Sequence, residues 1–225
     1  MGSGFSLTDE QMKAFEDILS KKDIFSSHIT KQEAKYDAFK ALGGHEKVLN
    51  EVKSKIPLSF KGQALIECDS SNLMDVFVAM VKFTIQSGSV PVLVLFMNNY
   101  VTVKNRLKEE GINEECFIID VVSKSISSVE DDTNLFFADS LRNLTQIQIK
   151  ILNVLSSKNN IALIFDSVSI LNYYHNDDVV FKFVYSLTKL VRKNNSSGFY
   201  ISTDNQISQK VGQFFDETIE LKKFV

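Results

Sequence analysis

Short apolar runs alternate with amphipathic stretches from residue 58 onward, and this alternation is the feature that most restricts the fold. The run VPVLVLF at residues 90–96 is apolar without a break, as expected of a strand buried on both faces. Similar runs predict strands at residues 62–68, 116–122, 161–166 and 198–203, and a final one from Glu217. Strands separated by helices predict an α/β fold with a mostly parallel central sheet flanked by helices on both faces.

The segments between these runs have apolar residues three and four positions apart, which predicts helices. In Ser71–Gln86, for example, Val76, Met80 and Phe83 share one side. Further helices are predicted at residues 100–110, 141–156 and 178–193, with a short one before the last strand, and a polar loop is predicted at 123–133. Ligands in such sheets bind at the carboxyl ends of the strands, so the residues directly after each strand are the candidates for a functional site.

The chain changes character near Pro57, where a polar, helix-prone segment gives way to the alternating pattern. We predict an N-terminal helical extension over residues 5–56 and an α/β core over residues 57–225, and we interpret Met1–Gly4 as an expression remnant. The extension contains three short amphipathic helices, which begin near Thr8, Thr30 and His45. Helices of this length bury little area alone, so we expect them to pack on the core or on a partner.

Charge and cysteine content restrict the partners and the compartment. The chain has 25 basic and 28 acidic residues, and its net charge of -3 does not favour nucleic acid as a partner. It has no apolar run of the roughly 18–20 residues that span a bilayer, and its first residues do not resemble a secretory signal. Cys68 and Cys116 lie inside apolar runs, which is typical of reduced, buried thiols. We therefore expect a cytoplasmic protein with no membrane contact.

The turn after the first strand is where a P-loop protein would hold phosphate. Such a loop needs glycines, whose backbone N–H groups surround the phosphates, and a lysine that reaches them. This chain has Asp69, Ser70, Ser71 and Asn72 at that place, with neither glycine nor lysine. The helix that follows still offers N–H groups, but Asp69 or Ser70 is expected to cap it. The pattern favours a capped turn over a phosphate-binding loop.

Two other strand ends contain polar residues. The second strand is followed by Asn98 and Asn99, and an amide cannot act as the base that activates water. Asp166 follows the fourth strand, where it could hold Mg²⁺ or cap the turn, and the sequence leaves both readings open. The aromatic residues Tyr173 and Tyr174, beside His175, could contact a partner or pack at the edge of the sheet.

Several strings together resemble archaeal RecA-superfamily, KaiC-like ATPase-domain proteins. They are NLTQIQIK, IFDSVSIL and FFDETIELK, which begin at Asn143, Ile164 and Phe214, together with the apolar strand at residues 90–96. The resemblance covers roughly residues 58–222. It implies a RecA-like P-loop NTPase fold, and active members have a Gly-Lys-Thr loop and an acidic residue after the second strand. They also have an acidic residue after the fourth strand, the Walker B position. Asp166 matches that position, and it is the only one of these functional positions that this chain matches.

The resemblance and its departures predict a catalytically inactive domain that acts as a protein-binding scaffold or regulatory subunit, with no cofactor. Its partner would be another protein or a second copy of the chain. The alternative is a nucleotide-binding protein or slow ATPase, in which Asp69, Ser70, Ser71, Asn72 and Asp166 hold ATP and Mg²⁺. Nucleic acid is not expected, because Glu130, Asp131 and Asp132 in the 123–133 loop would repel phosphate.

Overall fold

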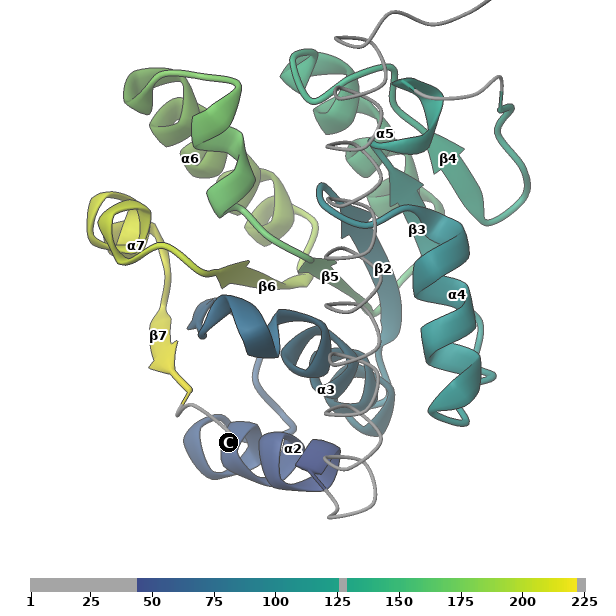
Figure 1. The fold of residues 1–225 in the computed structure, drawn as a ribbon, viewed down its shortest axis with the longest axis vertical. Coiled ribbons are helices and arrows are strands. Elements are labelled where there is room, and N and C mark those ends of the chain that lie inside the picture. The colour runs from purple at the N-terminus through teal and green to yellow at the C-terminus, as the bar shows by residue number, and fades with distance from the viewer. Residues whose placement is uncertain (1–43, 126–128, 222–225) are drawn as a thin grey trace, which may run out of the picture. The chain divides into compact units, whose positions relative to one another are not determined.

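The computed structural model describes residues 44–125 and 129–221 (Figure 1). The helices predicted from Thr8 and Thr30 lie outside the described residues. The third predicted helix is α2 (Gly44–Lys55). A boundary between two units of the chain falls between Gly44 and His45, so all of α2 except its first residue is in the same unit as the sheet. Its Val48 and Val52 are fully buried, which makes it part of the packed structure.

Seven parallel strands form one sheet in the order β4-β3-β2-β5-β6-β1-β7, as Figure 1 shows. The strands are β1 (Gln63–Glu67), β2 (Val90–Leu95), β3 (Phe117–Asp120), β4 (Leu135–Phe137), β5 (Ile161–Phe165), β6 (Ser197–Ser202) and β7 (Glu217–Glu220). The α/β class and the parallel sheet are thereby confirmed. Strand β4 was not predicted, because three residues are too few to show a strand period.

Helices cover both faces of the sheet (Figure 1). Besides α2 they are α3 (Leu73–Gln86), α4 (Tyr100–Glu109), α5 (Leu144–Ser157), α6 (Asp177–Lys193) and α7 (Asn205–Val211). The helices α2, α3 and α4 lie on one face, and α5, α6 and α7 lie on the other. Short 3₁₀ helices precede or follow several of these, namely η1 (Ser70–Asn72), η2 (Ser123–Ser125), η3 (Ser169–Tyr173) and η4 (Gly212–Phe214).

The core on the α5–α7 face forms because alternate residues of each strand point to the same side. Val92 and Val94 of β2 contribute to it, together with Ile147 of α5 and Val184 of α6. Its aromatic centre is Tyr200, whose ring stacks on that of Phe165 with centroids 4.5 Å apart. This dense packing fixes the strands whose carboxyl ends form the candidate site.

The order of the strands creates a switch point between β2 and β5. From β2 the chain moves outward to β3 and β4, and from β5 it moves the opposite way to β6. The loops that follow β2 and β5 therefore separate from each other at the carboxyl edge. In parallel α/β sheets this is where ligands bind.

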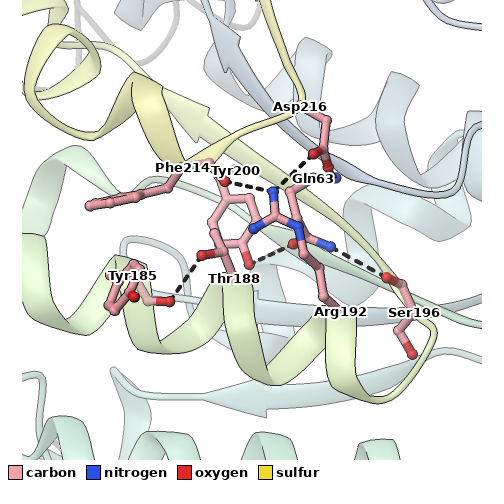
Figure 2. A network of polar contacts seen from close by, with 8 residues as sticks. All are labelled: Gln63, Tyr185, Thr188, Arg192, Ser196, Tyr200, Phe214 and Asp216. Carbon is pink, nitrogen blue, oxygen red and sulfur yellow. Dashed lines mark hydrogen bonds and ion pairs between the residues drawn. The ribbon is translucent and has the colours of Figure 1, made fainter.

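A polar network holds the opposite, amino end of the sheet together (Figure 2). Tyr200 Oη donates to Gln63 Oε1 at 3.0 Å, and Gln63 Nε2 donates to the carbonyl oxygen of Ser196 at 3.3 Å. Asp216 accepts the backbone N–H of Gln63 at 2.7 Å and an Arg192 Nη2 hydrogen at 3.0 Å. These bonds tie the entry of the edge strand β7 to β1 and to α6.

Candidate functional site at the carboxyl ends of the strands

The turn between β1 and α3 is closed by its own side chains. Asp69 Oδ1 accepts the backbone N–H of Ser71 at 2.9 Å and its hydroxyl at 2.6 Å. The backbone N–H of Asn72 donates to the carbonyl oxygen of Asp69 at 2.9 Å. Asp69 is thus the N-cap of η1 and occupies N–H groups that an open loop would direct at an anion.

The lysines that flank this turn in the sequence are engaged elsewhere. Lys61 donates to Asn160 Oδ1 at 2.7 Å, beside the amino ends of β1 and β5. Lys82, on α3, forms an ion pair with Glu110 at 3.0 Å. No Lys or Arg lies between these two positions in the sequence, so the turn itself supplies no cation to offset phosphate charge.

The Asp166 carboxylate lies at the switch point and is fully buried. Oδ1 accepts the N–H of Phe96 at 2.7 Å, and Oδ2 accepts those of Met97 at 3.0 Å and Asn98 at 2.9 Å. The Asn98 Nδ2 donates to Oδ2 as well, at 3.2 Å. Burial raises the pKa of this carboxyl, and the hydrogen bonds from these three residues oppose the increase. Both carboxylate oxygens are used to hold the loop after β2.

Asp120, at the end of β3 on the other side of β2, also anchors loop backbone groups, and the sequence analysis missed it. It is fully buried at the end of β3, where it accepts the backbone N–H groups of Tyr100, Val122 and Ser123 at 2.7–2.8 Å. The Ser123 hydroxyl adds a fourth bond at 2.7 Å. The signal was present, since FIID at residues 117–120 resembles LIFD at residues 163–166: in both, an Asp closes a buried apolar run. This parallel shows that a strand-end Asp in this fold can be a structural clamp.

The two asparagines after β2 also have structural partners. Asn98 donates its side-chain amide to Asp166, and Asn99 is the N-cap of α4, where its Oδ1 accepts the N–H of Thr102 at 2.9 Å. Neither side chain is a proton acceptor of useful basicity. The position after β2 therefore provides helix capping and loop anchoring.

The residues predicted to form one nucleotide site fall into two groups. Asp69, Ser70, Ser71 and Asn72 lie together at the end of β1, whereas Asp166 lies at the end of β5. Strand β6 separates β1 from β5, which places the two groups about 10 Å apart at the usual strand spacing. The space between them at this edge is bordered by buried serine hydroxyls, of which Ser169 and Ser202 lie 3.0 Å apart.

These serines do not form a catalytic group. Ser202 Oγ is bonded to the hydroxyls of Ser169 and Ser208, and the backbone N–H of Thr203 donates to Ser169 Oγ at 2.9 Å. His175, which follows Ser169 on the chain, has its Nε2 2.8 Å from the carbonyl oxygen of Leu141. Their partners among the described residues are hydroxyl and backbone groups, and none of these is the base that activates a serine.

An open pocket of about 260 Å³ lies at the switch point beside the loop held by Asp166. Its lining is mostly apolar and comes from the ends of β2 and β3, the segment before α5, and η3: Phe96, Met97, Val121, Val122, Ser140, Leu141, Ile170 and Tyr174. Met97 and Tyr174 are nearly half exposed. A pocket of this chemistry accommodates an apolar or aromatic group and offers nothing to neutralise a triphosphate.

Metal ligands do not gather in the described part of the chain: within residues 44–125 and 129–221, no three His, Cys, Asp or Glu residues could hold one ion together. Among the helices that the structure describes, none is both long and apolar enough to cross a bilayer. Asp166 accordingly has no acidic or imidazole neighbours to complete a metal site among the described residues. No protein-family model matches the sequence, and no curated protein shows significant similarity to it.

Proposed function

We propose that this chain is a catalytically inactive domain of the RecA-type, KaiC-like class that acts by binding a protein partner. The observation that carries the proposal is the β1–α3 turn, in which Asp69 bonds both the N–H and the hydroxyl of Ser71. An acidic residue in that role repels phosphate and satisfies the donors that phosphate would need.

The state of Asp166 supports the same conclusion. A Mg²⁺-holding acid needs at least one oxygen directed at the ion or its water shell. Both oxygens of Asp166 accept bonds from the loop of residues 96–98, and the side chain is fully buried. Asp166 thus occupies the place of the Mg²⁺-holding acid in the RecA-type resemblance. The hydrogen bonds of its carboxylate, however, are those of a residue that anchors a loop.

The pocket at the switch point supports protein binding over nucleotide binding. Its apolar lining and the exposed side chains of Met97 and Tyr174 suit the insertion of an apolar side chain. Methionine and tyrosine are favoured at protein interfaces because they combine apolar area with adaptable or polar ends. A scaffold or regulatory subunit would use such a pocket to recognise its partner.

Calorimetry with MgATP on the full chain tests the loss of nucleotide chemistry. We expect no heat of binding up to millimolar nucleotide and no phosphate release above the uncatalysed rate. Micromolar binding, with turnover lost in Asp166→Asn, would contradict the proposal. Asp166→Asn is chosen because it keeps the size of the side chain, and circular dichroism must show that the variant is folded.

One observation favours the alternative of a nucleotide-binding protein. Asn72 is buried at the amino end of α3, and its Nδ2 has no hydrogen-bond partner among the described residues. The neighbouring Ser70 is exposed and could approach a ligand. A thermal shift measures this directly, because nucleotide at 100 times its dissociation constant adds about 2.7 kcal/mol of stability. A shift that disappears in Asn72→Ala would support the alternative, and no shift in the wild type would exclude it.

A further inference from the structure

A second pocket, of about 320 Å³, lies between η3, α6 and α7 and is separate from the switch point. Its apolar walls are Val180 and Phe181 of α6 and Ile207 and Val211 of α7. The rest of the lining is polar: Asn172, Asp178, and the ion pair of Asp177 with Lys210 at 2.5 Å. The volume is at the lower end for ligand pockets, which suits a single bulky side chain rather than a large small molecule.

An aromatic cluster continues from this pocket along α6. The ring of Phe181 lies 4.6 Å from that of Phe214 in an edge-to-face arrangement, and Tyr185 lies 5.1 Å from Phe214. Phe181 and Tyr185 are 37% and 41% exposed, so this apolar area faces solvent although α6 is packed on its other side. Figure 2 shows Tyr185 and Phe214 beside the end of the polar network.

The same face of α6 is basic beyond its first turn. After Asp178 every charged residue in the helix is a cation, and all of them are exposed: Lys182, Lys189, Arg192 and Lys193. Lys182, Tyr185 and Lys189 recur at spacings of three and four, which places them on one side of the helix. The helix dipole accounts for cations in the last turn, but Lys182 lies too near the amino end for that explanation.

Some of these cations are already engaged and others are not. Arg192 donates to the Phe214 carbonyl oxygen at 2.8 Å and pairs with Asp216, as Figure 2 shows. The Lys189 ammonium lies 4.2 Å from the centre of the Tyr185 ring. Within the part of the chain that the structure describes, Lys182 and Lys193 have no ion-pair partner. The positive charges of Lys182 and Lys193 are therefore not offset by an ion pair within the described residues.

We infer that this α6/α7 face binds an acidic segment of a protein partner, with one apolar side chain of that segment seated in the pocket between α6 and α7. The inference rests on the proposed protein-binding function and adds the surface and the chemistry of the partner. Charge complementarity selects the acidic residues, which would lie along Lys182, Lys189 and Lys193. The pocket and the exposed Phe181 select the apolar anchor.

The arrangement of the rings favours a protein over single-stranded nucleic acid. A base stacks on an aromatic ring only when one face of the ring is open. Lys189 covers a face of Tyr185, and Phe214 lies against both Tyr185 and Phe181.

A display library of random twelve-residue peptides, selected on the immobilised full chain, tests the inference. Enriched peptides should have negative net charge and a Leu, Ile or Phe anchor. Their affinity, measured by fluorescence anisotropy, should fall at least tenfold for Lys182→Glu/Lys189→Glu and for Phe181→Ala. The matched control Lys47→Glu/Lys108→Glu makes the same charge change at exposed lysines of α2 and α4 and should bind as the wild type does.

The outcomes separate this surface from the broader function. Peptides that bind the double variant and the wild type equally, a lack of acidic bias, or a lack of enrichment would each overturn the α6/α7 surface. Tighter binding of a labelled oligothymidine than of any peptide would overturn the choice of a protein partner there. The calorimetry with MgATP is independent of these results, so the inactive-domain proposal stands or falls separately. Circular dichroism of each variant guards against unfolding.

Discussion

Asn98 donates its side-chain amide to the Asp166 carboxylate at 3.2 Å, and the two residues join the ends of β2 and β5 where the sheet changes direction. With the three backbone N–H groups that bond the same carboxylate, this contact fixes the loop that borders the switch-point pocket. Asp166, for which the sequence left metal binding and turn capping open, therefore holds the loop that lines this pocket.

Asp166→Ala should destabilise the fold strongly. The substitution leaves the buried N–H of Phe96, the half-buried N–H groups of Met97 and Asn98, and the Asn98 amide without their acceptor, and each such loss at a buried group costs about 1–3 kcal/mol. We expect a loss of about 3 kcal/mol or more in the free energy of unfolding, measured by urea denaturation. Glu130→Ala, at an exposed carboxylate, is the control and should change it by less than about 0.5 kcal/mol. A small effect of Asp166→Ala would contradict the structural role and would show that the loop does not depend on this carboxylate for its stability.

Asp69→Ala tests whether the turn after β1 is closed by its cap. It removes the acceptor of the Ser71 N–H and hydroxyl, and loss of an N-cap costs about 1 kcal/mol. Ser70→Ala, one residue on, deletes an exposed hydroxyl and should be nearly neutral in the same urea titration. Equal effects of the two substitutions would mean that Asp69 does not close the turn.

Much of the fold could be predicted because the spacing of apolar residues in a strongly periodic segment indicates whether that segment is a helix or a strand. Five of the predicted strands and five of the predicted helices, α2 to α6, lie within three residues of their observed bounds. The short β4 could not be found: its pairing with β3 depends on tertiary contacts that three residues do not encode. The 3₁₀ helices were not predicted either, because segments of three to five residues are too short to show a period.

The candidate site was predicted only in part, because a residue type does not reveal its hydrogen-bond partner. Capping by Asp69 was anticipated from the chemistry of helix starts. For Asp166 the sequence left metal binding and turn capping open, and only three-dimensional contacts place its oxygens against the loop after β2. The role of Asp120 is non-local too, since one of its donors, Tyr100, lies on another element.

Gly198→Ala should disrupt the polar network at the amino end of the sheet. A Cβ there would lie 2.3 Å from Gln63 Oε1 and 2.8 Å from the Tyr200 ring, both inside the buried network. Because neither group has room to move, we expect a loss of about 2 kcal/mol or more. Gly212→Ala is the matched control: its nearest atom is Thr218 Oγ1 at 3.9 Å, its φ of -51° suits alanine, and it should be neutral or slightly stabilising. A tolerated Gly198→Ala would mean that the Gln63–Tyr200 bond is not tightly packed.

The two thiols should make the fold sensitive to alkaline pH. Burial, and then the charge of Asp69, raises the pKa of Cys68 to about 12, and burial with Glu114 and Glu115 raises that of Cys116 to about 11. A thiol in the unfolded chain has a pKa of about 8.5, so above that pH the folded chain retains protons that the unfolded chain releases. The stability that the protonated thiols contribute is complete below about pH 8.5, and it is lost as the pH rises through the folded pKa values of about 11 and about 12. Thiolate absorbance at 240 nm should therefore appear near pH 8.5 in guanidinium but only above pH 10 in the native chain.

A Cys68→Ser/Cys116→Ser variant separates this effect from the ionisation of lysine and tyrosine. Its urea midpoint should fall less between pH 8 and pH 10.5 than that of the wild type, because it lacks the groups whose ionisation favours unfolding. The single variant Cys116→Ser isolates Cys68, and adding Asp69→Ala to it should lower the remaining thiol pKa by removing the nearest negative charge. Thiolate absorbance of the native wild type at pH 9 would show that the thiols are exposed to solvent. It would also show that the end of β1, beside the Asp69 turn, is not buried.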